Sequence, residues 1–358
     1  MKINSISLKN FRNYSQSKIE LSPRINLFLG NNGHGKTSLL EAVWICVNGR
    51  SYRTAKSKNV INFSNKSAEI EIRTTNNDSI NEIKVQITEN KKKFLVNDKK
   101  NKNRSELKKI LATVLIDREF KENLEKSFRP RRLILDSIMS NISLSFSKKL
   151  QLYSEEIKRK NEILRTSKND DILDFIDVRL LNLSHSLSSE RSLWLSRITN
   201  IAGKVLRKLA PKNSLDLNIK SDSLDSESLN SALKSNRIKE KITGKCLVGS
   251  HKDQISFILN GFDAFEFGSE GEKKSVSMAL KISEILLLKK VNNDFPIILV
   301  DEIGSEFDQK RFNFFYTFIT SLETQCFITA NNKSVLDINK SKDFSIFSII
   351  NGDCKKIS

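Results

Sequence analysis

The stretch Gly30-Asn31-Asn32-Gly33-His34-Gly35-Lys36-Thr37 decides how the rest of this sequence is interpreted. It fits the pattern G-x-x-x-x-G-K-[ST], after an apolar segment at 25–29 and before a segment at 36–47 whose apolar residues repeat at helical spacing. Glycines let backbone N–H groups converge on phosphate oxygens, and a helix N-terminus adds partial positive charge. The sequence therefore predicts a phosphate-binding loop between a strand and a helix of an α/β domain.

The loop residues have separate predicted roles. Lys36 would neutralise the β- and γ-phosphates of a nucleoside triphosphate, and the Thr37 hydroxyl would coordinate Mg²⁺. We therefore expect ATP and Mg²⁺ as cofactors. The nucleotide-binding residues predicted in this segment are Gly30, Asn31, Asn32, Gly33, His34, Gly35, Lys36, Thr37 and Ser38.

A pair of acids late in the chain matches this loop. Asp301 and Glu302 follow the apolar run 297–300 directly, at the carboxyl end of a predicted strand, where open α/β sheets bind ligands. Asp301 would hold Mg²⁺ and Glu302 would polarise the attacking water, so Glu302 and Lys36 are the predicted catalytic residues. An Asp-Glu pair after a strand is usually only a turn, but its combination with the glycine-rich loop favours the functional interpretation.

Composition narrows the class of protein. The 358 residues carry 61 Lys+Arg against 42 Asp+Glu, a formal net charge of +19. Such an excess attracts polyanions and indicates nucleic acid as a partner, although a biased genome composition would explain it too. The apolar runs are too short to span a membrane, and no secretory segment follows Met1. We therefore expect a cytoplasmic protein, without disulfides or structural zinc. The predicted DNA-binding residues are Lys91, Lys92, Lys93, Lys99, Lys100 and Lys102.

The periodicity of apolar residues divides the chain. Strand-like alternation prevails early, and helical spacing prevails from about 105 to 209, with separate helices expected at 172–187 and 193–209. The serine-rich stretch 214–237 is expected to be partly mobile, and strand character returns at 244–259. The predicted fold is an α/β domain, discontinuous in sequence, with an inserted helical lobe. The predicted boundaries are 1–104 for the first half of the α/β domain, 105–240 for the lobe and 241–358 for the second half.

Two further segments carry a resemblance to known ATPases. Phe267-Gly268-Ser269-Glu270-Gly271-Glu272 resembles the signature loop of ABC-type ATPases, and Ser305-Glu306-Phe307-Asp308 resembles the D-loop. Their order looks like the head of SMC-type proteins, with an insertion too short for long arms. The resemblance implies that Ser269 and Gly271 bind the nucleotide held by a second copy of the chain. Ser269 to Glu272 also fits a helix capping box, and both interpretations are kept.

Finer segments resemble the RecF family of bacterial recombination and gap-repair ATPases. They are Asn10-Phe11-Arg12-Asn13-Tyr14, Gly49-Arg50-Ser51-Tyr52-Arg53-Thr54, Arg131-Arg132 with Asp136, and Gly249-Ser250-His251-Lys252-Asp253. The resemblance implies a slow, DNA-stimulated ATPase that dimerises on ATP and binds gapped DNA at single-strand/double-strand junctions. It also implies work with RecR and RecO to promote loading of RecA. The chain departs from the family where Glu270 and Glu272 replace glutamines of the signature.

Other classes of protein share parts of this pattern. An SMC-like head of another DNA-related system, such as phage defence with a partner protein, remains the main alternative. The nucleotide-binding subunit of a transporter would need a histidine switch, where this chain has Thr329. A P-loop kinase would need neither signature nor D-loop.

Overall fold

The structure is a computed structural model that describes residues 2–76, 79–100, 107, 111–302, 308–331 and 344–358. The chain divides into two compact units, the first formed by Met1–Arg118 with Ile285–Ser358 and the second by Glu119–Glu284. This division differs from the predicted boundaries because residues 241–284 belong to the second unit. Strand β10 (Gln254–Leu259) pairs there with β9 (Leu215–Lys220), which ties the two segments together.

An antiparallel sheet forms one layer of the first unit, with the strand order β2-β1-β4-β5-β6-β7. The strands are β1 (Lys2–Phe11), β2 (Tyr14–Glu20), β4 (Ser67–Asn76), β5 (Ser79–Thr88), β6 (Lys92–Val96) and β7 (Lys99–Lys100). Apolar residues alternate along β4 and β5, so that Ile70, Ile72, Ile83 and Val85 face the core. The opposite face of the sheet carries the charged residues of these strands.

A second, mainly parallel sheet positions the predicted site. Its strand order is β15-β14-β3-β13-β12-β8, and β14, β3, β13, β12 and β8 run parallel. The strands are β3 (Ile25–Leu29), β8 (Thr113–Ile116), β12 (Ile297–Val300), β13 (Cys326–Ala330), β14 (Phe344–Ile350) and β15 (Asp353–Lys356). Every residue of β3, β8, β12 and β13 is buried, as is typical of a parallel sheet covered on both faces.

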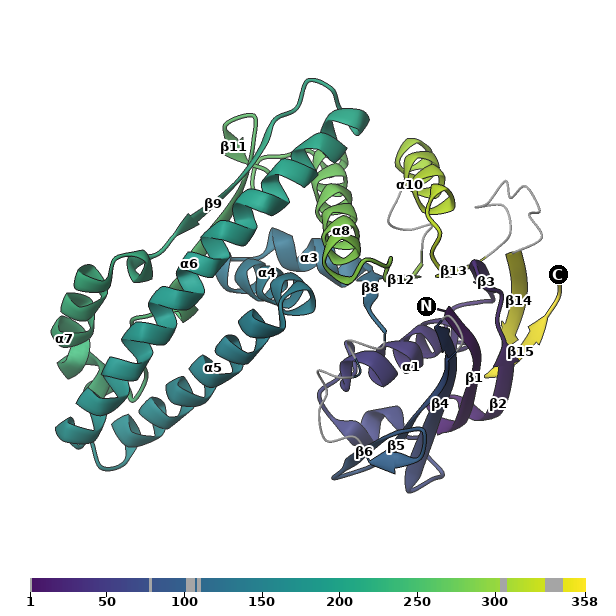
Figure 1. Ribbon diagram of the computed structural model, residues 1–358, viewed down its shortest axis with the longest axis horizontal. Coiled ribbons are helices and arrows are strands. Elements are labelled where there is room, and N and C mark those ends of the chain that lie inside the picture. Colours follow the sequence, from purple (N-terminus) through teal and green to yellow (C-terminus); the bar gives the residue numbers. More distant parts are fainter. Residues whose placement is uncertain (1, 77–78, 101–106, 108–110, 303–307, 332–343) are drawn as a thin grey trace. The chain divides into compact units, whose positions relative to one another are not determined.

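Helix α1 (Lys36–Asn48) contacts strands of both sheets and contributes much of the shared core. It begins directly after the glycine-rich loop and ends at Gly49, whose φ of 72° provides a left-handed cap that suits glycine. The first unit also holds a 3-10 helix η1 (Ser57–Val60) and helix α10 (Gln309–Ser321). Figure 1 shows α1 beside strands β1 and β4.

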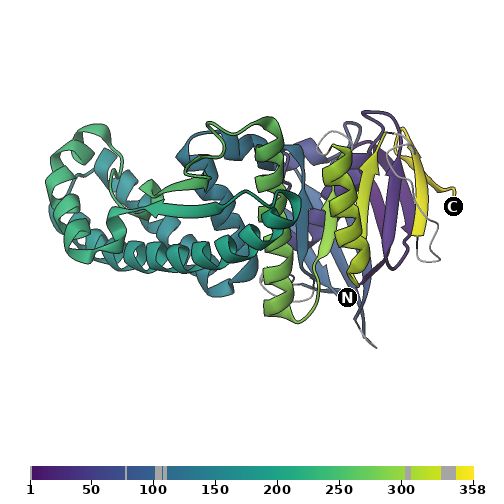
Figure 2. The same ribbon diagram turned by 90° about the horizontal axis from the view of Figure 1, so that it is seen from above.

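The second unit is mostly helical. Its helices are α3 (Arg118–Glu125), α4 (Phe128–Ile142), α5 (Leu144–Arg165), α6 (Asp170–Leu209), α7 (Ser226–Thr243) and most of α8 (Glu270–Asn292). Short 3-10 segments η2 (Asp222–Leu224) and η3 (Ser250–Lys252) and the strand β11 (Phe262–Asp263) complete it. Helices α5 and α6 lie side by side, as both Figure 1 and Figure 2 show.

Three expectations for this unit were wrong. The separate helices at 172–187 and 193–209 are one helix, α6, of 40 residues, because Ser188 and Arg191 are buried on the same face as its apolar residues. The stretch 214–237 is ordered as β9, η2 and most of α7, since β9 pairs with β10 and the Asp225 side chain caps α7. Strand structure begins only at Gln254, because the preceding residues form a loop and η3.

The four cysteines form no disulfide, and burial raises the pKa of each thiol. Cys46, Cys246 and Cys326 are buried, and Cys354 is half-buried. Within the described ranges, no helix is both long enough and apolar enough to cross a membrane.

Candidate functional site

The parallel sheet brings the predicted site residues to one edge. Strand β13 lies between β3 and β12, and all three strands run in the same direction. The glycine-rich loop follows β3, Asp301 follows β12, and Asn331 follows β13. Their carboxyl ends therefore place the loop, the acidic pair and Asn331 side by side.

The glycine-rich loop depends on glycine at defined positions. Gly33 and Gly35 have φ values of 83° and 117°, a region that other residues rarely adopt. A Cβ at Gly35 would also lie 2.7 Å from Nδ2 of Asn13. The loop is braced by its neighbours, since the Tyr14 hydroxyl donates to the Gly35 carbonyl at 3.0 Å. The Asn10–Tyr14 segment thus supports the loop from the β1–β2 turn.

Lys36 lies inside the loop, with only 4% of its surface exposed. Its ammonium donates to the carbonyls of Gly30 and Asn31 at 2.6 and 3.0 Å, and to Oδ1 of Asn331 at 3.0 Å. Burial lowers the pKa of Lys36, although the nearby Glu302 and Asp301 oppose this shift. Among the described residues, the hydrogen-bond acceptors of this cation are neutral, so a phosphate oxygen could replace them and form a charge-assisted hydrogen bond.

A cluster of oxygens lies beside Lys36. The hydroxyls of Thr37 and Thr329 donate to the same oxygen of Asp301, at 3.0 and 2.8 Å. Burial raises the pKa of Asp301, and these two hydrogen bonds oppose the shift. Hydroxyl and carboxylate oxygens are the ligands that Mg²⁺ prefers, so Thr37 and Asp301 fit the predicted metal site.

Glu302 adopts an unusual backbone conformation at the end of β12. Its φ is 53°, in the left-handed region that disfavours residues with a side chain, and its amide donates to the Thr329 hydroxyl at 2.7 Å. Strained residues of this kind are concentrated at functional sites. Thr329 therefore contacts both acids, a role that the sequence analysis did not find. Asn331 was also missed. Thr329 stands where a transporter subunit would have its switch histidine, but no local pattern gives either residue a contact within the site.

A buried ionic cluster involves helix α1 one turn after Thr37. The Glu41 side chain is fully buried and accepts two hydrogen bonds from Arg12, at 2.9 and 2.8 Å. Ser51 also donates to it, and Arg53 lies 3.5 Å away. This cluster explains why the segments Asn10–Tyr14 and Gly49–Thr54 each carry an arginine, and it gives Arg53 a structural contact. Glu41 belongs to no local motif in the sequence.

The signature-like segment lies in the second unit, at the start of α8. Ser269 and Glu272 form a capping box: the Ser269 amide and hydroxyl donate to the Glu272 carboxylate at 2.9 and 2.8 Å. Glu270 pairs with Lys121 at 2.6 Å and with Lys273 at 3.7 Å. The Gly271 carbonyl accepts from the Ser275 hydroxyl. Ser269 itself is exposed, so the capping contact leaves its surface accessible.

The D-loop prediction is only partly open to inspection. Ser305, Glu306 and Phe307 lie outside the described residues. Asp308 caps helix α10, since its side chain accepts from the Arg311 amide at 2.9 Å.

The segment Gly249–Asp253 belongs to a buried network of the second unit. Arg191, 1% exposed, forms two hydrogen bonds with Asp136 and one with Asp253. His251 is held by the Tyr153 hydroxyl at 2.6 Å and the Cys246 carbonyl at 3.1 Å, and burial lowers its pKa to about 4. We assign this segment a structural role.

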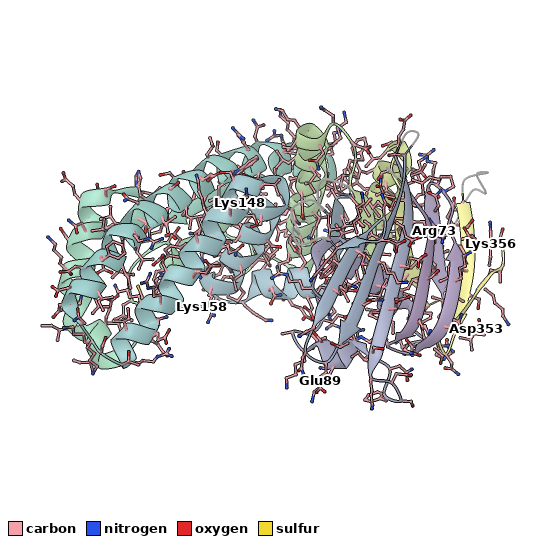
Figure 3. The ribbon with its side chains drawn as sticks, turned by 60° about the horizontal axis from the view of Figure 1, so that its bottom comes forward. Arg73, Glu89, Lys148, Lys158, Asp353 and Lys356 are labelled. Atoms are coloured by element: carbon pink, nitrogen blue, oxygen red, sulfur yellow. The ribbon has the colours of Figure 1, made fainter. Side chains whose placement is uncertain are left out.

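The predicted DNA-binding lysines lie at the β6–β7 edge of the antiparallel sheet. Lys91, Lys93, Lys99 and Lys100 are exposed, Lys92 is half-buried, and Lys102 lies outside the described residues. On the neighbouring strands β4 and β5 the basic residues are paired with acids: Lys84 and Arg73 form ion pairs with Glu69, Glu71 and Glu82. Figure 3 labels Arg73 and, at the tip of the β5–β6 hairpin, Glu89. Exposed lysines thus gather at this edge, next to strands whose basic residues are paired with acids.

Comparisons with known proteins cover nearly the whole chain. Residues 2–352 match the family model of the RecF/RecN/SMC N terminal domain. The chain is 30% identical to the DNA replication and repair protein RecF of Ruminiclostridium cellulolyticum, covering 99% of each chain. It is 29% identical to the protein of the same name from Clostridium acetobutylicum, covering 98% of this chain and 99% of that one.

A solved structure agrees with these relatives. The recombination mediator protein RecF with ATP, from the RecFOR pathway, superposes with a TM-score of 0.89 at 25% identity, covering 99% of each chain. The fold class predicted from the sequence is thereby confirmed. The chain therefore belongs to the RecF/RecN/SMC family of ABC-type ATPase heads and, within it, to RecF.

Proposed function

We propose that this chain binds ATP with Mg²⁺ at the glycine-rich loop and hydrolyses it slowly, at a rate stimulated by DNA. One observation carries this proposal: Lys36 and the Thr37–Asp301 pair meet at the carboxyl edge of the parallel sheet. The name of the solved relative, RecF with ATP, supports the choice of nucleotide. Bound Mg²⁺ would neutralise charge on the phosphates during hydrolysis.

The protein residues would divide the work on the triphosphate. The Lys36 ammonium would exchange its carbonyl partners for phosphate oxygens, and the amides at the start of α1 would bind the same phosphates. Thr37 and Asp301 would hold the metal ion. Glu302 would orient the attacking water, and its position is fixed by the hydrogen bond that its backbone amide donates to the Thr329 hydroxyl.

We propose further that two copies of the chain close on ATP. A P-loop contacts one side of the triphosphate, so the other side would receive Ser269 and Gly271 of a second copy. The charge of the signature segment is compatible with this role: Glu270 is paired with Lys121 and Lys273, and Glu272 is engaged by Ser269. Hydrolysis would then loosen the dimer and act as a timer.

The names of the relatives support the proposed biological setting. They are named DNA replication and repair proteins, and the solved structure is described as a recombination mediator of the RecFOR pathway. We therefore propose that this chain acts in recombinational and replication-gap repair in the cytoplasm. It would bind gapped DNA through Lys91, Lys93, Lys99 and Lys100, and act with RecR and RecO to promote RecA loading.

The ATPase rate of the full chain, with and without gapped DNA, tests this function. The wild type should hydrolyse ATP slowly, and faster when DNA is present. Lys36→Ala should reduce the rate at least about 100-fold, because it removes a charge that stabilises the transition state. Lys148→Ala is a matched control, because it removes an exposed lysine of α5 in the second unit. Undiminished hydrolysis by Lys36→Ala would contradict the proposed role of the loop.

A further inference from the structure

A groove lies at one end of the antiparallel sheet, among residues that the nucleotide-binding proposal does not use. Its volume is about 830 Å³, within the range of ligand-binding clefts. It lies between the turn 62–66 and the tip of the β5–β6 hairpin, and η1 contributes to its wall. The residues that line the groove include Arg12, Lys58, Asn59, Phe63, Lys66 and Glu89.

Phe63 is the most unusual residue of this groove. Its exposure is 108% of the reference value, although the preceding Val60 and Ile61 are buried in the core. A phenyl ring placed fully in water gains nothing for folding, since its apolar surface stays hydrated. The position of this ring therefore needs an explanation other than core packing.

The turn that carries Phe63 is well braced. The Asn65 amide donates to the Asn62 carbonyl at 2.9 Å, and the Asn62 amide donates to the Asn10 carbonyl of β1 at the same distance. The Arg12 guanidinium fixes the neighbouring Asn59 carbonyl at 2.6 Å while it holds the buried Glu41. The ring is thus presented on a fixed scaffold, which reduces the entropy lost when a ligand binds.

The groove also carries uncompensated positive charge. Neither Lys58 nor Lys66 forms an ion pair with any residue that the structure describes. Among the described residues that line the groove, Glu89 is the only acid, against Lys58, Lys66 and Arg12. Arg12 is already neutralised by Glu41, so the two lysines provide the available charge. Lys91, exposed just beyond the hairpin tip, adds to it.

We propose that this groove binds single-stranded DNA, with a base stacked on Phe63 and the neighbouring phosphates paired with Lys58 and Lys66. The inference rests on the proposed function, which it deepens by naming a DNA subsite. An exposed aromatic face flanked by cations is the usual arrangement for single strands, because only an unpaired base can stack on it. A duplex keeps its bases stacked on one another and offers mainly phosphates to a protein.

Fluorescence anisotropy of a labelled oligothymidylate with the full chain tests the stacking contact. Phe63→Ala should weaken binding about tenfold, the scale of losing one stacked base, and Phe63→Trp should restore it to within about twofold. Phe175→Ala, which truncates an exposed phenylalanine of α6, should have no effect. Because Phe63 is fully exposed, its variants should unfold at the same temperature as the wild type.

The salt dependence tests the phosphate contacts. Each of Lys58→Ala and Lys66→Ala should reduce the slope of log affinity against log salt by about 0.7, the value for one single-strand phosphate contact. Lys356→Ala is the matched control, because this exposed lysine lies on β15, away from Glu89 and the groove. The Phe63→Trp ring should also lose fluorescence when the oligonucleotide binds.

The outcomes separate this inference from the function on which it rests. Wild-type protein that binds neither gapped nor single-stranded DNA would contradict the proposed function itself. Wild-type binding that Phe63→Ala leaves unchanged, or that it weakens equally for duplex DNA, would overturn the groove assignment alone. Absence of quenching in Phe63→Trp would likewise overturn it, and would leave a protein partner as the ligand of this surface.

Discussion

Asp301 is a half-buried carboxyl group whose surroundings disfavour its charged form relative to water. Burial raises its pKa, and the Thr329 and Thr37 hydroxyls offset only part of that shift. The folded state therefore holds a proton more tightly than the unfolded state, and folding stability falls as pH rises through this window. This residue weakens the fold at neutral pH, which is a common property of functional sites.

Asp301→Asn should separate function from stability. The amide keeps the size of the side chain and an oxygen for the two hydroxyls but removes the buried charge. We expect ATP hydrolysis to fall at least about 100-fold while the urea midpoint at pH 7 stays equal or rises. The stability difference from wild type should shrink as pH falls and the wild-type carboxyl becomes protonated. A lower midpoint at pH 7 would show that the carboxylate stabilises the fold.

His251 gives a pH prediction of the opposite sign. Its folded pKa of about 4 lies below the ordinary value of 6.5, so acid favours the unfolded state, which binds the proton first. Stability should fall between about pH 6.5 and pH 4, by up to about 3 kcal/mol from this residue. His251→Gln should remove that part of the acid sensitivity in urea unfolding across this range. Identical pH profiles for the two proteins would show that His251 is not buried as described.

The residues of the candidate site differ in how well the sequence predicts them. Lys36, Thr37 and Asp301 stand in short motifs beside apolar runs, and local patterns suffice to find them. Thr329 and Asn331 become site residues only because β13 lies between β3 and β12, which depends on strand order. Glu41 looks like an ordinary helical residue until Arg12 and Ser51 are folded onto it.

Among the elements, the start of α8 carries an observed capping contact and the proposed dimer contact in one residue. Ser269 caps the helix through Glu272, and the proposed dimer also uses its exposed hydroxyl. The glutamine that the RecF family usually has at position 272 would serve the capping box equally well. The acidic signature of this chain is therefore compatible with a structural role of Glu272.

Substitutions at Ser269 separate these two functions. Ser269→Ala should lower the free energy of unfolding by about 1 kcal/mol through loss of the cap, whereas Ser269→Asn should retain it. Both variants should weaken ATP-dependent dimerisation, since neither has the hydroxyl. Urea unfolding measures the change in stability, and sedimentation with ATP measures dimerisation. Normal dimerisation of both variants would leave Ser269 with the capping role alone.

The predicted elements were most accurate where periodicity is continuous. Helix α1 and strand β12 matched their expected ranges to within about one residue at each end. Helix α6 appeared as two helices because Ser188 and Arg191 interrupt its apolar pattern. Their partner Asp253 comes from a distant segment, so the sequence alone does not show that these polar residues are buried.

At the scale of the whole molecule, the net charge of +19 predicts phosphate-dominated DNA binding. A plot of log affinity for duplex DNA against log salt concentration should have a slope of about −3 to −4, if the exposed lysines of the β6–β7 edge (Lys91, Lys93, Lys99 and Lys100) contact phosphates. Lys91→Ala with Lys93→Ala should reduce this slope by about 2. Lys148→Ala with Lys158→Ala, on α5, removes the same charge elsewhere (Figure 3). Equal slopes for both double variants would contradict the edge assignment.

The discontinuous organisation of the chain was predictable, but the boundaries of its units were not. The order of glycine-rich loop, helical insertion and acidic strand indicated that a domain is split in sequence. The switch back from helical to strand periodicity near 244 suggested an earlier return to the head. The structure keeps residues up to Glu284 in the second unit, because β10 and the Asp253 carboxylate are bound to inserted elements.

Sedimentation of Glu302→Gln with ATP and Mg²⁺ shows whether two copies of this chain close on ATP. This variant should bind ATP without hydrolysing it, and so should sediment as a stable dimer. It should return to a monomer without nucleotide or when Lys36→Ala is added. A protein that remains monomeric with saturating ATP, or a dimer that Lys36→Ala leaves intact, would contradict the account.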